Sequence, residues 1–145
     1  MSRLSKWSSW FLCSALLIAS SLTAFADQAS EQATQLAGTK AREWVLNKFE
    51  TFMGSEGGCK SGESYRFKVD HTVVISTCVS GKVQSETQQW SIQSATASET
   101  HVLVGDKSYI LKFWQDSKGQ FMMLRTMGSS IVQPTKDMIF QLAED

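Results

Sequence analysis

The sequence predicts an all-β domain, an eight-stranded antiparallel up-and-down barrel. From residue 63 onward, stretches of the sequence alternate apolar and polar side chains. This period of two is typical of a sheet with one face exposed to solvent. Turn-forming residues separate these stretches every 8 to 15 residues, with no long helical pattern among them. Eight is the number of strands at which such a sheet closes around its own side chains or one small ligand.

Residues 1–26 have the composition of an export signal. Arg3 and Lys6 precede an apolar stretch over 10–19, and Ala24-Phe25-Ala26 is typical of a signal cleavage site. The apolar stretch is shorter than the roughly 20 residues that span a bilayer. We therefore expect cleavage after Ala26, no membrane span in the mature protein, and a periplasmic or secreted location.

The mature chain has the size of one domain. Removal of residues 1–26 from the 145-residue chain leaves 119 residues, enough for a substantial core. Residues 27–39 are polar and predict a loosely attached lead-in or a short polar helix, an appendage to a single domain over 40–145. The whole chain has 14 basic and 14 acidic residues. Because two of the basic residues lie in the signal, the mature chain has 12 basic and 14 acidic residues. This balance argues against nucleic-acid binding, which favours a basic surface.

Two cysteines, Cys59 and Cys78, lie beyond the signal, and in an exported chain such a pair predicts a disulfide. The rival interpretation is a metal site. Two thiolates make only half a zinc site, and His71 and His101 lie at no spacing that completes it. We therefore expect a disulfide and no metal or other cofactor. For a closed loop of about 20 residues the chain-entropy model gives roughly 3 kcal/mol of stabilisation.

The first strand is ambiguous. The apolar residues of 40–53 fit one face of a helix that Gly54 ends, but the same stretch also alternates, with Trp44 and Leu46 on one strand face. The β-rich remainder of the chain favours a strand. The alternative fold is α+β, with helix 40–53 packed on an antiparallel sheet. The glycine-rich stretch 54–62 that follows predicts a loop.

The later strands follow from turns and alternation. Asp70-His71 supplies a tight turn into the third strand, and Ser80-Gly81-Lys82 turns into the fourth. The last segment, 135–143, fits either a helix opened by Pro134 or a closing strand. With a closing strand, the eight expected strands lie at about 43–52, 63–69, 72–78, 83–92, 99–104, 108–114, 120–127 and 135–143.

Several short segments rich in aromatic or apolar residues follow one another over residues 36–143. They are Leu36-Ala37-Gly38-Thr39, Trp44, Tyr65-Arg66-Phe67, Trp90, Tyr109-Ile110-Leu111 and Met123-Leu124-Arg125. Their order resembles that of small bacterial lipocalin-like barrels. In lipocalins the first-strand tryptophan directly follows the Gly-x motif, whereas Trp44 stands six residues beyond Gly38. The resemblance implies a closed barrel with a ligand-binding mouth or a partner-facing rim, and it implies no catalytic residue.

The sequence favours binding over catalysis. It contains no nucleophile elbow, no paired-histidine zinc motif and no phosphate-binding glycine loop, so we do not expect an enzyme. His71 falls in a predicted turn. His101 lies in a strand near Glu99, where it is either a pH-sensitive group or, more commonly, an exposed strand histidine.

Aromatic side chains are expected to fill most of the core. They are Trp44, Phe49, Tyr65, Phe67, Trp90, Tyr109, Phe113 and Phe121. The candidate ligand contacts are Trp44, Tyr65, Phe67, Trp90, Tyr109, Phe113 and Arg125. For Arg125 two orientations are open: inward, where it meets an anionic ligand, or outward on an alternating strand.

Two functions are consistent with these features. The first is a monomeric binding protein that captures a small apolar or amphipathic molecule in its barrel. The second is an inhibitor or interaction protein that acts on a protease or a lysozyme. Its contact surface is expected in residues 27–39 or in the loop 54–62 around Cys59.

Overall fold

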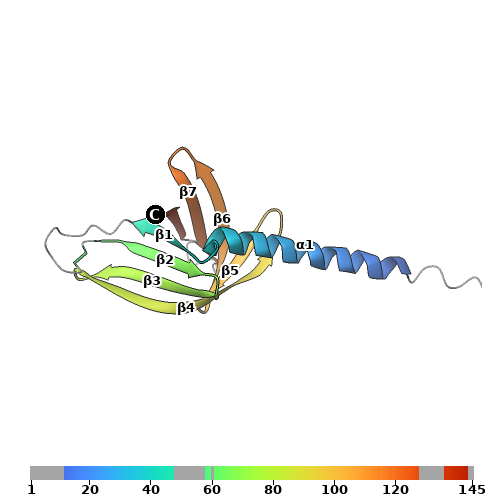
Figure 1. Cartoon of the computed structure of the whole chain (residues 1–145), viewed down its shortest axis with the longest axis horizontal. Helices are drawn as coiled ribbons and strands as arrows, with labels where there is room; N and C mark the ends of the chain where they lie inside the picture. Colours follow the sequence, from blue (N-terminus) through green and yellow to red (C-terminus); the bar gives the residue numbers. More distant parts are fainter. Residues whose placement is uncertain (1–11, 48–57, 60, 128–135, 144–145) are drawn as a thin grey trace, which may run out of the picture.

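The computed structural model describes residues 12–47, 58–59, 61–127 and 136–143. Within these ranges one helix, α1 (Leu12–Ala37), precedes eight strands (Figure 1). The strands are β1 (Ala41–Asn47), β2 (Glu63–Lys68), β3 (Thr72–Val79), β4 (Lys82–Ala95), β5 (Thr100–Val104), β6 (Lys107–Asp116), β7 (Gly119–Thr126) and β8 (Asp137–Leu142).

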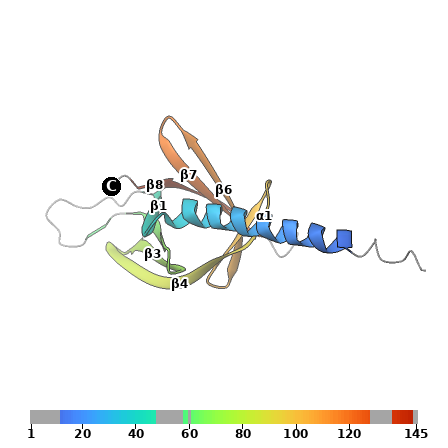
Figure 2. The same cartoon turned by 45° about the vertical axis from the view of Figure 1, so that its right-hand side comes forward.

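The strands form the predicted barrel. Each strand pairs antiparallel with the next, and β1 pairs with β8 to close the sheet (Figures 1 and 2). The α+β alternative is wrong for Ala41–Asn47, which is a strand, while 48–53 lies outside the described residues. The helical interpretation of 135–143 is likewise wrong for Asp137–Leu142. Both segments form strands although their sequences also fit a helix. The reason is that β2 and β7 each have an edge whose backbone N–H and C=O groups need hydrogen-bond partners.

Side chains that point inward build one apolar core. Alternate residues of the strands face the interior, except where irregularities in β1 and β4 shift the register. The strands contribute these buried apolar residues to it: Trp44, Tyr65, Phe67, Val73, Ile75, Trp90, Val102, Val104, Tyr109, Leu111, Met122, Leu124, Met138 and Phe140.

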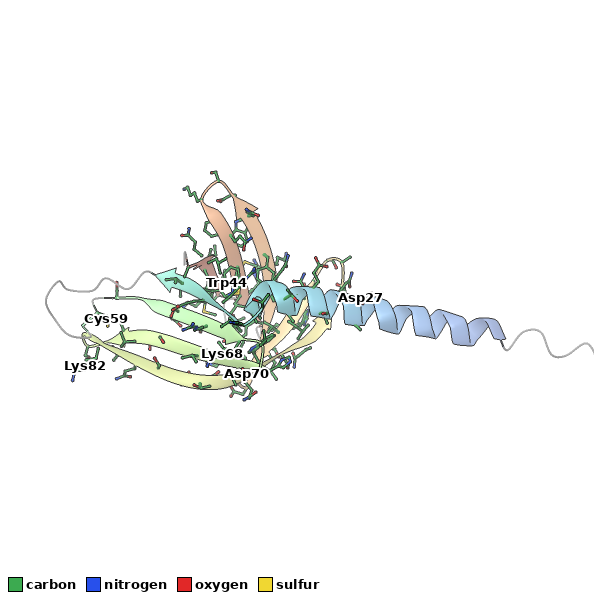
Figure 3. All side chains as sticks on the ribbon, viewed as in Figure 1. Asp27, Trp44, Cys59, Lys68, Asp70 and Lys82 are labelled. Carbon is green, nitrogen blue, oxygen red and sulfur yellow. A yellow bond between two sulfur atoms is a disulfide. The ribbon has the colours of Figure 1, made fainter. Side chains whose placement is uncertain are left out.

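The last turn of α1 closes one end of the barrel. Leu36 and Ala37 are buried in the core, so the interpretation of 27–39 as an appendage is wrong at its C-terminal end. Figure 3 shows Trp44 beside this end of the helix. α1 runs without a break through Ala26, the expected cleavage site, and its N-terminal part extends beyond the strands (Figures 1 and 2).

Three carbonyl groups at the end of α1 have defined partners. Helices end with backbone carbonyls that no helical N–H can reach. The carbonyl of Leu36 accepts a hydrogen bond from the Trp44 indole Nε1 at 2.9 Å, and that of Gln35 accepts one from Arg42 at 2.9 Å. Gly38 has a φ of 66° and its N–H bonds to the Thr34 carbonyl at 2.8 Å, which ends the helix in the left-handed conformation that glycine adopts readily. We call residues 34–37 the closing turn.

The disulfide lies at the other end of the molecule. Cys59 and Cys78 are joined, with their Cα atoms 5.9 Å apart, which confirms the predicted pair. The N–H of Cys59 bonds to the carbonyl of Gly81, and the N–H of Cys78 bonds to that of Gly62. The chain before β2 is thus fastened to the turn between β3 and β4, near the labelled Lys82 in Figure 3.

Candidate ligand-binding mouth

The barrel is uneven in length, and this creates a cavity. β4 has 14 residues, and β3 pairs with 82–89, whereas β5 pairs only with 90–95. The sheet of β2, β3 and β4 therefore extends past the β5–β6 turn, as Figure 1 shows on its left side. Over 82–89, β4 therefore pairs with β3 on one edge, and no described strand pairs with its other edge, on the side where β5 lies.

This region contains a cavity of about 370 Å³, at the small end of the range for ligand pockets. We call it the mouth cavity. Its lining residues come from β2, β3, β4 and the β5–β6 hairpin. They are Glu63, Tyr65, Ile75, Thr77, Gln84, Ser85, Glu86, Gln88, Val104, Asp106, Lys107 and Tyr109.

The floor of the mouth cavity is apolar and fixed. Tyr65, Ile75, Val104 and Tyr109 are all buried members of the core. The Tyr65 ring packs edge-on against Phe140 with ring centroids 4.9 Å apart. This contact holds the Tyr65 ring in place without a ligand, which is the preorganisation that favours binding.

The rim of the mouth cavity is polar. Gln88 donates a hydrogen bond from Nε2 to Oε1 of Glu86 at 2.7 Å, which orients that carboxylate. Gly105 has a φ of 62°, and a Cβ atom there would lie 2.5 Å from Oε1 of Gln88. A glycine thus lets the β5–β6 turn approach the rim closely. The charged lining residues are Glu63, Glu86, Asp106 and Lys107, three carboxylates and one ammonium group.

The surroundings of both tyrosines disfavour the ionised phenol. Burial is the main cause of the raised pKa of Tyr65, and the negative charge of Glu63 adds to it. Burial also raises the pKa of Tyr109, with contributions from Asp106 and Glu63. Both hydroxyl groups therefore stay protonated at neutral pH, so each tyrosine contributes a neutral side chain to the lining of the mouth cavity.

Two of the seven predicted ligand contacts, Tyr65 and Tyr109, line the mouth cavity. Trp44, Phe67 and Trp90 lie in the packed core instead. The indole Nε1 of Trp90 bonds to the backbone carbonyls of Lys68 and Thr72, at 3.0 and 3.1 Å, so this side chain joins β4 to the β2–β3 hairpin.

The other two candidates are far from the mouth cavity. Phe113 is half-buried and contacts Trp44 at the closed end, with ring centroids 5.5 Å apart. Arg125 lies on the outer face of the barrel and forms a two-pronged ion pair with Asp137 of β8, at 2.6 and 2.8 Å. The inward orientation of Arg125 is therefore wrong, because its neighbour Leu124 takes the inward position on β7.

Both histidines lie outside the mouth cavity. His71 occupies the predicted turn with a φ of 64°, and its ring contacts Trp90 with centroids 4.9 Å apart. His101 is on β5 within hydrogen-bond distance of Glu99. Phe49 and most of the loop 54–62 lie outside the described residues.

Sequence reasoning missed the charged rim. Gln84, Glu86 and Gln88 stand at alternate positions of β4, so they share its inner face. The opposite face of this half-strand is also mostly polar, so no contrast in polarity between the two faces indicates which one points inward. The signal that marks the unfilled part of this barrel is the run of polar residues over 84–89 on one long strand.

A second hollow lies on the outside, along the short contact between β1 and β8. This groove of about 490 Å³ is lined mainly by apolar residues of β1, β7 and β8, including Val45, Phe121 and Ile139. Trp114 stacks on Phe121 nearby, with ring centroids 5.4 Å apart, and is 40% exposed.

The described residues contain no group of three or more side chains able to hold a metal ion. The described helix does not combine the length and apolar character that a bilayer crossing requires. Comparisons with models of known families, with curated proteins and with solved structures found no match. The barrel shape alone does not identify a family.

Proposed function

We propose that this protein is an exported binding protein that takes a small amphipathic molecule into its mouth cavity. The observation that carries the proposal is the division of the cavity into an apolar floor and a polar rim. Tyr65, Ile75 and Tyr109 offer contacts to an apolar body, and the rim offers partners to a polar head. The lining is more polar than that of a typical pocket for an apolar ligand, which favours a guest that has a polar head as well as an apolar body.

The packing of the core supports an entrance at the mouth cavity. The core extends from its floor to the closing turn, with Phe67, Trp90 and Leu36 fully or almost fully buried. A purely apolar guest would strip water from the polar rim without replacing its hydrogen bonds, which costs free energy. An amphipathic guest avoids that cost.

The proposed location is the periplasm or the exterior of the cell. The joined cysteines Cys59 and Cys78 are compatible with an oxidising compartment. We propose that the lipocalin-like resemblance reflects a shared mode of binding inside a barrel, and that the protein acts by binding rather than by catalysis. His71 and His101 lie away from the mouth cavity and take no part in this role.

A pair of neighbouring substitutions tests the proposal. Gln84→Trp places a large ring in the mouth cavity, whereas Val83→Trp places the same ring on the opposite face of β4, where Val83 is 47% exposed. The full-length chain is expressed with its own N-terminal segment, and the purified product is titrated with three probes of one tail length: hexyltrimethylammonium, 1-hexanol and hexyl sulfate. Binding is followed by NMR of ring-labelled tyrosine, since Tyr65 and Tyr109 are the two tyrosines of the chain.

We expect at least one probe to shift both tyrosine signals in the parent protein and in the Val83→Trp variant. Gln84→Trp should abolish the shifts while leaving the melting temperature nearly unchanged. The proposal fails if none of the three probes shifts a tyrosine signal, or if Gln84→Trp binds them as the parent does.

A second candidate function, inhibition of a protease or a lysozyme, is favoured by the apolar outer surface. Ile139 is 50% exposed beside the groove between β1 and β8, and Trp114 is exposed next to it. Contiguous apolar surface of this kind, unlike a single exposed apolar side chain, commonly marks a protein interface. Inhibition of lysozyme or trypsin that Ile139→Ser and Trp114→Ala abolish, and that Gln84→Trp preserves, would favour this function over ligand capture.

A further inference from the structure

We infer that the ligand of the mouth cavity is an organic cation, an amine or quaternary ammonium compound with a short apolar body. This inference rests on the proposed function and specifies its ligand. It follows from the distribution of charge around the cavity, from the aromatic rings in its floor and from the spacing of its carboxylates.

The mouth cavity has an excess of negative charge. Glu63, Glu86 and Asp106 face one basic side chain, Lys107, which leaves a net formal charge of −2. The three carboxylates come from β2, β4 and the β5–β6 turn, so they surround the opening from different sides. A concave surface lined by one sign of charge concentrates the opposite sign within it.

Lys107 does not cancel this charge by direct pairing. The ion pairs found between described residues join His101 to Glu99 and Arg125 to Asp137, and neither involves the mouth cavity. Among the described residues, Lys107 thus has no ion pair with a rim carboxylate. A bound cation would gain from all three carboxylates, whereas a bound anion would be repelled by them.

The floor of the cavity suits a cation with an apolar body. The faces of aromatic rings attract positive charge, and Tyr65 and Tyr109 both belong to the floor. The carboxylates that oppose ionisation of these two phenols act on any charge in the cavity, and they favour a positive one. Ile75 and Val104 add apolar surface against which an alkyl chain packs.

The spacing of the carboxylates favours an organic cation over a metal ion. A metal ion needs several ligands that converge on one point, at about 2.0–2.6 Å for Mg²⁺ or Ca²⁺. Among the described residues no three acidic, histidine or cysteine side chains converge in this way. A larger cation of low charge density does not need such convergence.

The three hexyl probes test the inference because they share a tail and differ in head charge. We expect hexyltrimethylammonium to bind more tightly than 1-hexanol, and hexyl sulfate to bind most weakly. Glu63→Gln and Glu86→Gln each keep the shape of the side chain and should weaken binding of the cation about fivefold. Lys107→Gln should strengthen it by a similar factor.

Glu43→Gln is the matched control, because it removes the same charge from β1 at a position outside the mouth cavity. It should leave the affinity for hexyltrimethylammonium unchanged. Binding of 1-hexanol should be insensitive to all four charge substitutions, which separates electrostatic effects from damage to the cavity.

The outcomes distinguish this inference from the proposed function. If 1-hexanol or hexyl sulfate binds as tightly as the cation, and Gln84→Trp abolishes that binding, ligand capture holds and the cation inference is overturned. If Glu43→Gln weakens cation binding as much as Glu63→Gln does, the inference is also overturned, because the effect is then one of overall charge. If no probe binds in the mouth cavity, the proposed function itself fails.

Discussion

The two ends of this barrel are built from the same alternating strands but reach opposite results. At one end the closing turn inserts Leu36 and Ala37 into the core, and Trp44 and Arg42 bind the last carbonyls of α1. At the other end, inward positions on β4 hold Gln84, Glu86 and Gln88, and the space in front of them stays open. In this barrel the end of a helix completes the core at one end, and polar inward residues mark the part of the interior that the protein leaves unfilled.

The ends also differ in how their polar groups are satisfied. At the closed end the protein supplies the partners, because the indole N–H of Trp44 and the guanidinium of Arg42 meet backbone carbonyls. At the mouth cavity the rim side chains are more exposed, and Gln88 and Glu86 bond to each other. Substitutions at the closed end should therefore reduce stability, and those at the mouth cavity should affect binding.

The largest expected effect is that of Trp44→Ala. It removes a side chain that is 1% exposed and leaves the Leu36 carbonyl without its partner, so we expect a loss of about 3–5 kcal/mol in the free energy of unfolding. Urea unfolding followed by circular dichroism measures it. Gln84→Ala at the mouth cavity should change the same quantity by less than about 0.5 kcal/mol. Equal losses in the two variants would contradict the distinction between the ends.

Removal of the disulfide should have the next largest effect. The double variant Cys59→Ser with Cys78→Ser opens a loop that spans 19 positions, and we expect a loss of about 2–4 kcal/mol. Because this bond fastens the chain before β2 beside the mouth cavity, the variant should also weaken probe binding. Calorimetric unfolding and the tyrosine NMR titration measure the two effects. A destabilised variant that binds the probes at full affinity would show that the bond does not support the cavity.

A smaller effect is expected at the residue that ends α1. Gly38→Ala forces a side chain into a φ of 66° and within 3.0 Å of Arg42, so it should cost about 1–2 kcal/mol. Gly38→Asn should cost less, because asparagine tolerates the left-handed region better. Thermal unfolding of the two variants gives the order. If alanine is tolerated as well as asparagine, the backbone conformation at the end of α1 is not a constraint.

The smallest effect concerns alkaline pH. The raised pKa of Tyr65 means that the unfolded chain loses this proton near pH 10 while the folded protein keeps it. The free energy of unfolding should therefore fall as pH rises above about 10, and the fall should be shallower in Tyr65→Phe. Urea unfolding at a series of pH values measures the two slopes. Identical slopes would mean that Tyr65 is not protected from ionisation.

The sequence was sufficient to predict the barrel because period-two patterns and turn residues are local signals. The Asp70-His71 turn and the Cys59–Cys78 bond were predicted for the same reason, from chemistry that neighbouring residues or paired cysteines carry. The role of Leu36 was not predictable, since its burial depends on Trp44 and on a barrel end that forms only in three dimensions.

The candidate site was predicted only at Tyr65 and Tyr109. Aromatic residues in strands look alike in sequence whether they fill a core, as Phe67 does, or line a cavity. What separates them is the unequal length of β4 and β5, which sets where the filled part of the barrel ends.

One end of the barrel is filled, and we propose that the other admits a cationic guest. The most direct measurement is an NMR titration with hexyltrimethylammonium that follows the ring signals of Tyr65 and Tyr109 together with the indole N–H of Trp44. We predict that both tyrosine signals shift in a saturable way and that the Trp44 signal stays constant. A saturable shift of Trp44 with unchanged tyrosine signals would contradict the claim.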